Sequence, residues 1–133
     1  MPFVLDASVS GSWALADETS AIADAAADRL QGDTALVPHI WWYEVRNILL
    51  VSERRKRITA ADIVVFLNLL SDHPIQIDYA EDEHAILGLA RQYQLSFYDA
   101  AYLAVALRHH APLATLDKDL RAAAISAGVS LLC

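Results

Sequence analysis

The chain has 133 residues, of which 56% are hydrophobic and 20% charged, and its net charge is −7. This length suits one domain, 1–133, that buries a core without disulfides, and the composition excludes an intrinsically disordered chain. Short apolar runs, no basic leader and a single cysteine, Cys133, lead us to expect a cytoplasmic protein without a membrane span.

Strand and helix patterns alternate along the sequence. An apolar run predicts a strand at 3–5, followed by helices at 8–16 and 21–30, a strand at 36–37 and a long helix over 38–55. A helix from Thr59, a strand at 75–77, helices at 81–93 and 98–109, a strand at 113–115, a helix at 118–126 and a strand at 129–131 follow. This alternation predicts an α/β fold with helices on both faces of a parallel sheet, and a ligand site beyond the carboxyl ends of its strands.

Positive charge is concentrated in one stretch of the sequence. Five of the ten basic residues lie within twelve positions: Arg46, Arg54, Arg55, Lys56 and Arg57. The stretch is either a solvated helix end or a surface that meets phosphates or an acidic partner. The net charge argues against broad binding of nucleic acid, but two divalent ions held by carboxylates would reduce it from −7 to −3.

Four acidic residues occupy positions that need an explanation. Asp6 and Asp117 each follow a predicted strand, where capping of the next helix is the alternative reading. Glu44 lies on a helical stripe of apolar residues, where a salt bridge with an arginine is the alternative. Asp99 is three residues after Ser96, as in a capping box. If the four carboxylates converge, they repel one another unless a cation is present, and such oxygen-rich clusters suit Mg²⁺ or Mn²⁺.

The segments around these acids resemble the four motifs of the PIN-domain family, and match its VapC-type toxins best. They are residues 4–8 (Val-Leu-Asp-Ala-Ser), 43–47 (Tyr-Glu-Val-Arg-Asn), 96–104 (Ser-Phe-Tyr-Asp-Ala-Ala-Tyr-Leu-Ala) and 113–120 (Leu-Ala-Thr-Leu-Asp-Lys-Asp-Leu). Order and spacing match over essentially the whole chain. The resemblance implies a three-layer α/β/α fold with a mostly parallel sheet of about five strands. It also implies a metal-dependent endoribonuclease that acts as the toxin of a toxin–antitoxin pair, a homodimer, and a small antitoxin that blocks the site.

The resemblance also assigns roles to residues. The acidic quartet, which would hold Mg²⁺ or Mn²⁺ and carry out RNA hydrolysis, is Asp6, Glu44, Asp99 and Asp117. Ser8 and Thr115 match hydroxyl positions that support such a site, Asn47 can hold Glu44 by a hydrogen bond, and Asp119 is a secondary candidate. The antitoxin is expected to insert a basic side chain, an arginine, among the carboxylates.

Other chemistries lack their motifs or remain as rivals. The five histidines have no zinc-ligand spacing, and no phosphate-binding glycine loop or Gly-x-Ser-x-Gly elbow is present. One rival is a phosphoacceptor or phosphatase domain, although Asp6 lacks the second acid of its motif; the other is a noncatalytic PIN-like binding module. Trp41, Trp42 and Tyr43 serve either core or dimer packing or the stacking of bases, and the apolar flank of 63–70 is another candidate dimer surface.

Overall fold

The computed structural model describes residues 1–132. Cys133, the single cysteine on which part of the expected cytoplasmic location rests, lies outside the described residues. The elements in chain order are β1 (Phe3–Leu5), α1 (Ala7–Ser12), α2 (Ala21–Arg29), β2 (Ala35–Pro38), α3 (Ile40–Arg54), α4 (Ala60–Ser71), β3 (Ile75–Asp78), α5 (Glu83–Tyr93), α6 (Phe97–His109), β4 (Leu113–Ala114) and α7 (Lys118–Ser126). Every predicted helix is present. The first helix is shorter than predicted. It ends at Ser12, and the residues after it form hydrogen-bonded turns instead of continuing the helix.

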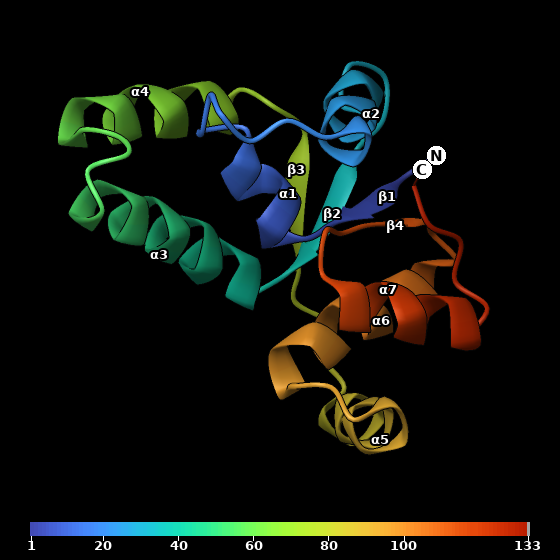
Figure 1. Ribbon diagram of the computed structural model, residues 1–133. Helices are drawn as coiled ribbons and strands as arrows, with labels where there is room; N and C mark the ends of the chain where they lie inside the picture. Colours follow the sequence, from blue (N-terminus) through green and yellow to red (C-terminus); the bar gives the residue numbers. More distant parts are fainter. Residues whose placement is uncertain (133) are drawn as a thin grey trace.

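The four strands form a parallel sheet in the order β3-β2-β1-β4 (Figure 1). The expected fifth strand is reduced to one bridge, between Leu131 and Leu113. Its neighbour β4 spans only two residues, so few backbone groups are available to hydrogen-bond with a further strand. The α/β class and the parallel sheet are confirmed. The sheet places the carboxyl ends of β1 and β4 side by side, since Leu5 pairs with Ala114.

Helices cover both faces of the sheet (Figure 1). Helices α1 to α4 lie on one side, and α5, α6 and α7 lie on the other. The strands are buried as doubly covered strands should be, and Phe3, Val4 and Leu5 are fully inaccessible. Helix α6 is buried over most of its circumference between the sheet and its neighbours, as its apolar sequence indicates. Within residues 1–132, no helix combines the length and apolar character needed to cross a bilayer.

Helices α3 and α1 cross at close range beside the first strand. A Cβ atom on Gly11 would lie 2.8 Å from Cγ2 of Ile48, so a larger side chain at position 11 would push the helices apart. Trp41 fills the same region, and its Nε1 donates a 2.9 Å hydrogen bond to Ser10 Oγ. Trp41 is therefore a core residue, and its candidacy as dimer surface is wrong. The close crossing fixes α3, and with it Glu44, against the end of β1.

Candidate acidic site

Asp6 follows β1 directly and lies at the N-cap position of α1, yet its side chain makes no capping hydrogen bond. Its Oδ2 instead accepts hydrogen bonds from Ser8 Oγ and Thr115 Oγ1, both at 2.7 Å. Burial raises the pKa of the Asp6 carboxyl, and these two hydroxyls oppose the rise without cancelling it. The charge of Asp117 raises it further. Capping does not explain Asp6; the surroundings hold its carboxylate in place.

The two hydroxyls also join the ends of β1 and β4. Ser8 Oγ accepts a hydrogen bond from the Leu116 backbone N–H at 3.1 Å. Thr115 Oγ1 accepts one from the Asp117 N–H, also at 3.1 Å, and Thr115 is fully buried. Both residues lie where the resemblance places supporting hydroxyls. Each hydroxyl donates to Asp6 and accepts a backbone N–H from the segment that follows β4, so its donor and both of these bonds are fixed by the fold.

Glu44 extends from α3 and is half-buried. Its Oε1 accepts a 2.7 Å hydrogen bond from Tyr102 Oη, which in turn accepts a 3.4 Å bond from the Ala7 N–H. Burial raises the pKa of Glu44, the Tyr102 bond lowers it, and the charges of Asp6 and Asp99 raise it. No arginine forms a salt bridge with this carboxylate among residues 1–132, so the salt-bridge alternative is wrong.

The residue that holds Glu44 is Tyr102, which sequence reasoning missed. Asn47, predicted for this task, is exposed and makes no side-chain bond to Glu44 within the described residues. Tyr102 is fully buried on α6, and burial raises the pKa of its phenol so that the group remains a protonated donor. A tyrosine on a helix that is apolar nearly all round needs a partner for its hydroxyl, and this was the available signal.

Asp99 and Asp117 complete the quartet from two helix starts. Ser96 caps α6 by accepting the Asp99 N–H at 3.1 Å, but the reciprocal bond of a capping box is absent from that described helix. Burial first, then the charges of Asp117 and Asp6, raise the pKa of Asp99 to about 6. Asp117 does cap α7, through Oδ1 and the Leu120 N–H at 2.9 Å.

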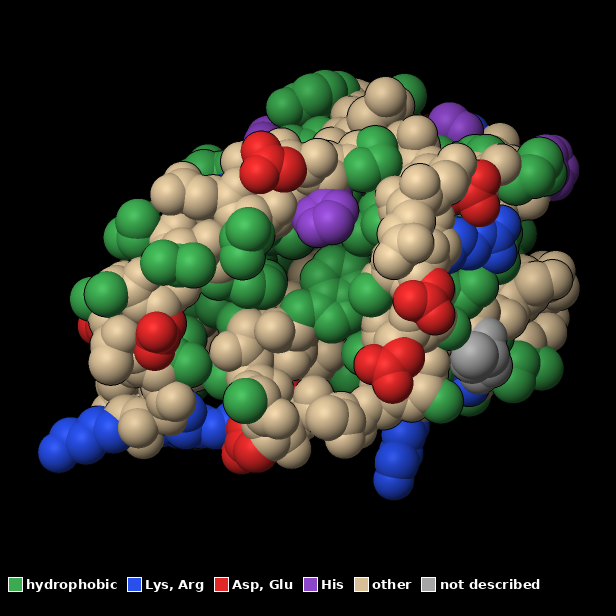
Figure 2. All heavy atoms as spheres, turned by 90° about the horizontal axis from the view of Figure 1, so that it is seen from above, with side chains coloured by type: hydrophobic (Ala, Val, Ile, Leu, Met, Phe, Trp, Pro, Cys, Tyr) green, Lys and Arg blue, Asp and Glu red, His purple; other side chains and the backbone are tan. Residues whose placement is uncertain are grey.

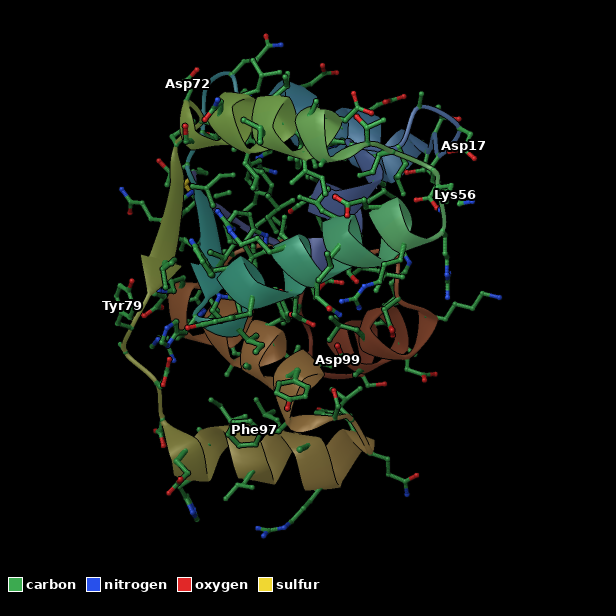
Figure 3. All side chains as sticks on the ribbon, turned by 90° about the vertical axis from the view of Figure 1, so that its left-hand side faces the viewer. Asp17, Lys56, Asp72, Tyr79, Phe97 and Asp99 are labelled. Atoms are coloured by element: carbon green, nitrogen blue, oxygen red, sulfur yellow. The ribbon has the colours of Figure 1, made fainter. Side chains whose placement is uncertain are left out.

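The structure brings the quartet together at the carboxyl edge of the sheet. The charge of Asp117 raises the pKa of Asp6 and Asp99, and the charges of Asp6 and Asp99 raise the pKa of Glu44, which places the four carboxylates within electrostatic reach of one another. Figure 3 looks onto this edge and shows Asp99 at the start of α6, below α3. Asp119 is exposed and adds its charge to the surroundings of Asp99. A cluster of this sign and density attracts cations.

The quartet fits a divalent cation by donor chemistry. Among residues 1–132, no group of three or more acidic, histidine or cysteine side chains stands in a metal-holding arrangement. Hydrogen bonds occupy Asp6 Oδ2, Glu44 Oε1 and Asp117 Oδ1, and like charge opposes closer approach of the carboxylates. Four carboxylates are nevertheless hard oxygen donors of the kind that Mg²⁺ and Mn²⁺ prefer. Burial raises the pKa values of Asp6, Glu44 and Asp99, and the charges of neighbouring quartet members raise them further.

The basic stretch does not join the acidic site. Arg57 is paired with Asp17 Oδ1 at 2.8 Å and Glu18 Oε1 at 3.2 Å, so it is not the free phosphate-binding group that was predicted. Residues 54 to 56 are exposed at the far end of α3, roughly 15 Å along the helix axis from Glu44. Figure 3 shows Lys56 near Asp17 and away from Asp99.

The Arg46 side chain also has partners of its own within the protein. Its guanidinium carbon lies 3.9 Å from the ring centroid of Trp42, and its Nη1 donates to the Trp42 carbonyl at 3.0 Å. Burial of this guanidinium lowers its pKa. The side chain is therefore fixed on the surface of α3 by its own helix.

The comparisons with known proteins agree with this architecture. The sequence profile of the PIN domain matches residues 3–126. The structure is similar to the Pyrobaculum aerophilum protein PAE2754, with a TM-score of 0.72, 24% identity, and coverage of 92% of this chain and 84% of that one. It is also similar to Mycobacterium tuberculosis VapC20, a toxin that cleaves the sarcin–ricin loop, with a TM-score of 0.61, 15% identity, and coverage of 91% and 94%. No curated protein sequence matches the chain.

Proposed function

Because the chain belongs to the PIN-domain family, a family of nucleases, we propose that it is a metal-dependent endoribonuclease and the VapC-type toxin of a toxin–antitoxin pair. The observation that carries the proposal is the convergence of four carboxylates at one sheet edge, with Asp6 held by two hydroxyls. Family membership decides against the phosphoacceptor alternative. We further propose that residues 1–133 form one domain.

The quartet residues would hold Mg²⁺ or Mn²⁺ and act on an RNA phosphodiester. A bound divalent cation supplies neutralisation of developing negative charge and activation of water. Asp6, Asp99 and Asp117 would bind it, while Ser8 and Thr115 keep the Asp6 carboxylate in one orientation. Glu44, held by Tyr102, orients the attacking water and takes up its proton. Water attacks phosphorus and the bond to the leaving oxygen breaks, without a covalent enzyme intermediate.

The acidic site also suggests how a partner would silence the protein. A guanidinium from a small antitoxin can take the place of a divalent cation and pair with two carboxylates at once. The fold is similar to that of the toxin VapC20, and this similarity supports the assignment. RNA is the proposed substrate, and the exposed end of α3, at Arg54, Arg55 and Lys56, is the remaining candidate for contact with flanking phosphates.

Helix α4 is the candidate surface for a homodimer. It is strongly apolar, yet only Leu70 on it is buried, and Val64, Val65 and Leu69 are each 59% exposed. Figure 2 shows hydrophobic side chains gathered over this part of the surface. Exposed apolar area of this kind marks an interaction site more often than a free surface. Light scattering at micromolar concentration is expected to report a dimer, and a monomer would contradict this part of the proposal.

The nuclease proposal is tested with nuclease-free protein and single-stranded RNA. Cleavage is expected with Mg²⁺ or Mn²⁺ and none in excess EDTA. Asp6→Asn removes one charge with little change of shape, so the fold should remain while most cleavage is lost. Asp24→Asn, which changes an aspartate on α2 outside the quartet, is the matched control and should cleave normally. Undiminished cleavage in EDTA, or by Asp6→Asn, would overturn the proposed mechanism.

A further inference from the structure

A groove of about 550 Å³ opens beside the acidic quartet, between the start of α3, α5 and α6. We call it the aromatic groove, and its principal lining residues are His39, Tyr43, Ile86, Phe97, Tyr98 and Arg108. No member of the quartet lines it. Its volume lies within the range of small-molecule pockets, which is about 300–1,000 Å³.

Three aromatic side chains in this groove are unusually exposed. Tyr43 is 60% accessible, Tyr98 56% and Phe97 43%. None of the three makes a side-chain hydrogen bond within residues 1–132 that would explain its position. Flat apolar rings that face an open groove offer stacking platforms, on which every nucleobase can lie because each has a π-face.

The charges around the groove select a base over a phosphate. Arg108 donates a 2.7 Å hydrogen bond to Asp78 Oδ2, so its charge is already compensated. Glu81 and Glu83 add negative charge to the lining, and His39 is 3.4 Å from Glu81. A phosphate would meet carboxylates here, whereas an uncharged base would meet aromatic rings and hydrogen-bond acceptors.

Residues of the groove and of the quartet are neighbours in the sequence on two helices, α3 and α6. Tyr43 precedes Glu44 on α3, and Tyr98 precedes Asp99 on α6, so each ring is attached one residue from a quartet carboxylate. Figure 3 shows Phe97 and Asp99 at the same end of α6. The groove therefore lies next to the quartet along both helices.

From these contacts we infer that the aromatic groove binds an unpaired nucleobase of the RNA, next to the phosphate that the quartet cleaves. This inference rests on the proposed nuclease function. It assigns Tyr98 and Tyr43 as base-stacking residues and restricts substrates to RNA in which a base can leave its neighbours, as single-stranded loops allow.

The first test requires neither metal nor cleavage. Adenosine and cytidine, which carry no phosphate, are titrated into the full-length protein in EDTA, and the aromatic side-chain resonances are followed by NMR. Saturable shifts are expected for Tyr43, Phe97 and Tyr98, and not for Trp13, which lies outside the aromatic groove and donates its Nε1–H to the Ala23 carbonyl. Ribose 5-phosphate should give no shifts. Absence of shifts, or equal shifts at Trp13, would overturn the inference.

The second test uses variants. Tyr98→Ala should abolish the nucleoside shifts and raise the KM for single-stranded RNA about tenfold, with kcat little changed, because one stacking contact is lost. Ile125→Ala, which shortens an exposed side chain on α7 outside the groove, is the matched control and should change neither quantity. If Tyr98→Ala leaves the nucleoside-induced shifts unchanged and instead alters the mass of the oligomer in solution or releases a protein partner, the groove is a protein interface and the inference is wrong. If wild type binds nucleosides but cleaves no RNA, the nuclease proposal fails while the base site stands.

Discussion

The Tyr102 hydroxyl donates a 2.7 Å hydrogen bond to Glu44 Oε1 while accepting the Ala7 N–H at 3.4 Å. One phenol thus connects α6, α3 and the residue that follows Asp6. The ring of Tyr102 is fully buried, so its hydroxyl has no freedom to leave this position. Glu44 is held toward the quartet by a donor that stays protonated at any physiological pH.

The first prediction concerns Tyr102→Phe, which keeps the ring and removes the donor. We expect a loss of about 1–2 kcal/mol in the free energy of unfolding, since a partly buried carboxylate loses its partner. If Glu44 orients the attacking water, kcat falls about tenfold or more while the KM for RNA changes little. Urea unfolding and cleavage kinetics measure the two effects. Tyr93→Phe, a half-buried tyrosine elsewhere on the same side of the sheet, is the control. Equal kcat values in wild type and Tyr102→Phe would show that this bond serves packing alone.

The second prediction follows from the pKa of Asp99, which is raised from 3.8 to about 6. A carboxyl that binds its proton more tightly in the folded state lowers the free energy of unfolding as the pH rises from about 4 to 6. Above pH 6 this loss of stability stays constant. In EDTA at pH 7, Asp99→Asn should therefore be as stable as wild type, or more stable by about 1 kcal/mol after allowance for solvent screening. Below pH 4 this difference should vanish. A simple loss of stability at pH 7 would indicate a structural role for Asp99.

The third prediction is stabilisation by metal. A cation that binds only the folded cluster raises the free energy of unfolding by about 2.7 kcal/mol when its free concentration is a hundredfold above its dissociation constant. Thermal melts with Mn²⁺ and with EDTA measure this effect. Wild type should melt at a higher temperature with Mn²⁺, and Asp99→Asn or Asp6→Asn should respond less. Identical melting temperatures of wild type in both conditions would contradict a metal-binding quartet.

The fourth prediction concerns Asp78, outside the acidic site. Burial pushes the pKa of its carboxyl upward, but hydrogen bonds from Arg108 and His109 and from the Ala80 N–H outweigh it and leave the pKa at about 2. A depressed pKa stabilises the fold above the unfolded value of 3.8, and this contribution is lost as the pH falls toward 2.

Asp78→Asn should therefore cost on the order of 1–2 kcal/mol at pH 7 and little at pH 2. Asp72→Asn changes an exposed aspartate at the end of α4 and is the control. Urea unfolding at several pH values checks both variants. A cost for Asp78→Asn that is independent of pH would exclude an electrostatic origin.

The sequence alone predicted the elements because most of them carry local signals. The capping box of Thr59 and Asp62 and the apolar strand before Asp6 are examples, and both appear in the structure. It also placed Asp6, Glu44, Asp99 and Asp117 at one sheet edge, since parallel strands end together. The hydrogen-bond partners of these carboxylates were harder to predict from the sequence. Whether Asp6 caps α1 depends on a hydroxyl at Thr115, 109 positions away, and not on local pattern.

Other errors have the same origin. Asn47 stands at helical spacing from Glu44, but the actual donor comes from a different helix. Arg57 belongs to a basic run in the sequence, yet the turn after α3 brings it to Asp17 and Glu18. Trp41 and Trp42 are neighbours, and the helix buries one and exposes the other. Local sequence identifies which groups need partners, while the tertiary fold decides which partners they receive.

The bond between Thr115 and Asp6 also sets when the acidic site can be completed during synthesis. Asp6 is translated 109 residues before the threonine that orients it, and the last quartet member, Asp117, follows that threonine. A nascent chain that ends before β4 has neither, so its acidic edge is incomplete while translation continues. If the protein is the toxin proposed above, a ribosome that is still making it is not exposed to an active nuclease by that same unfinished chain.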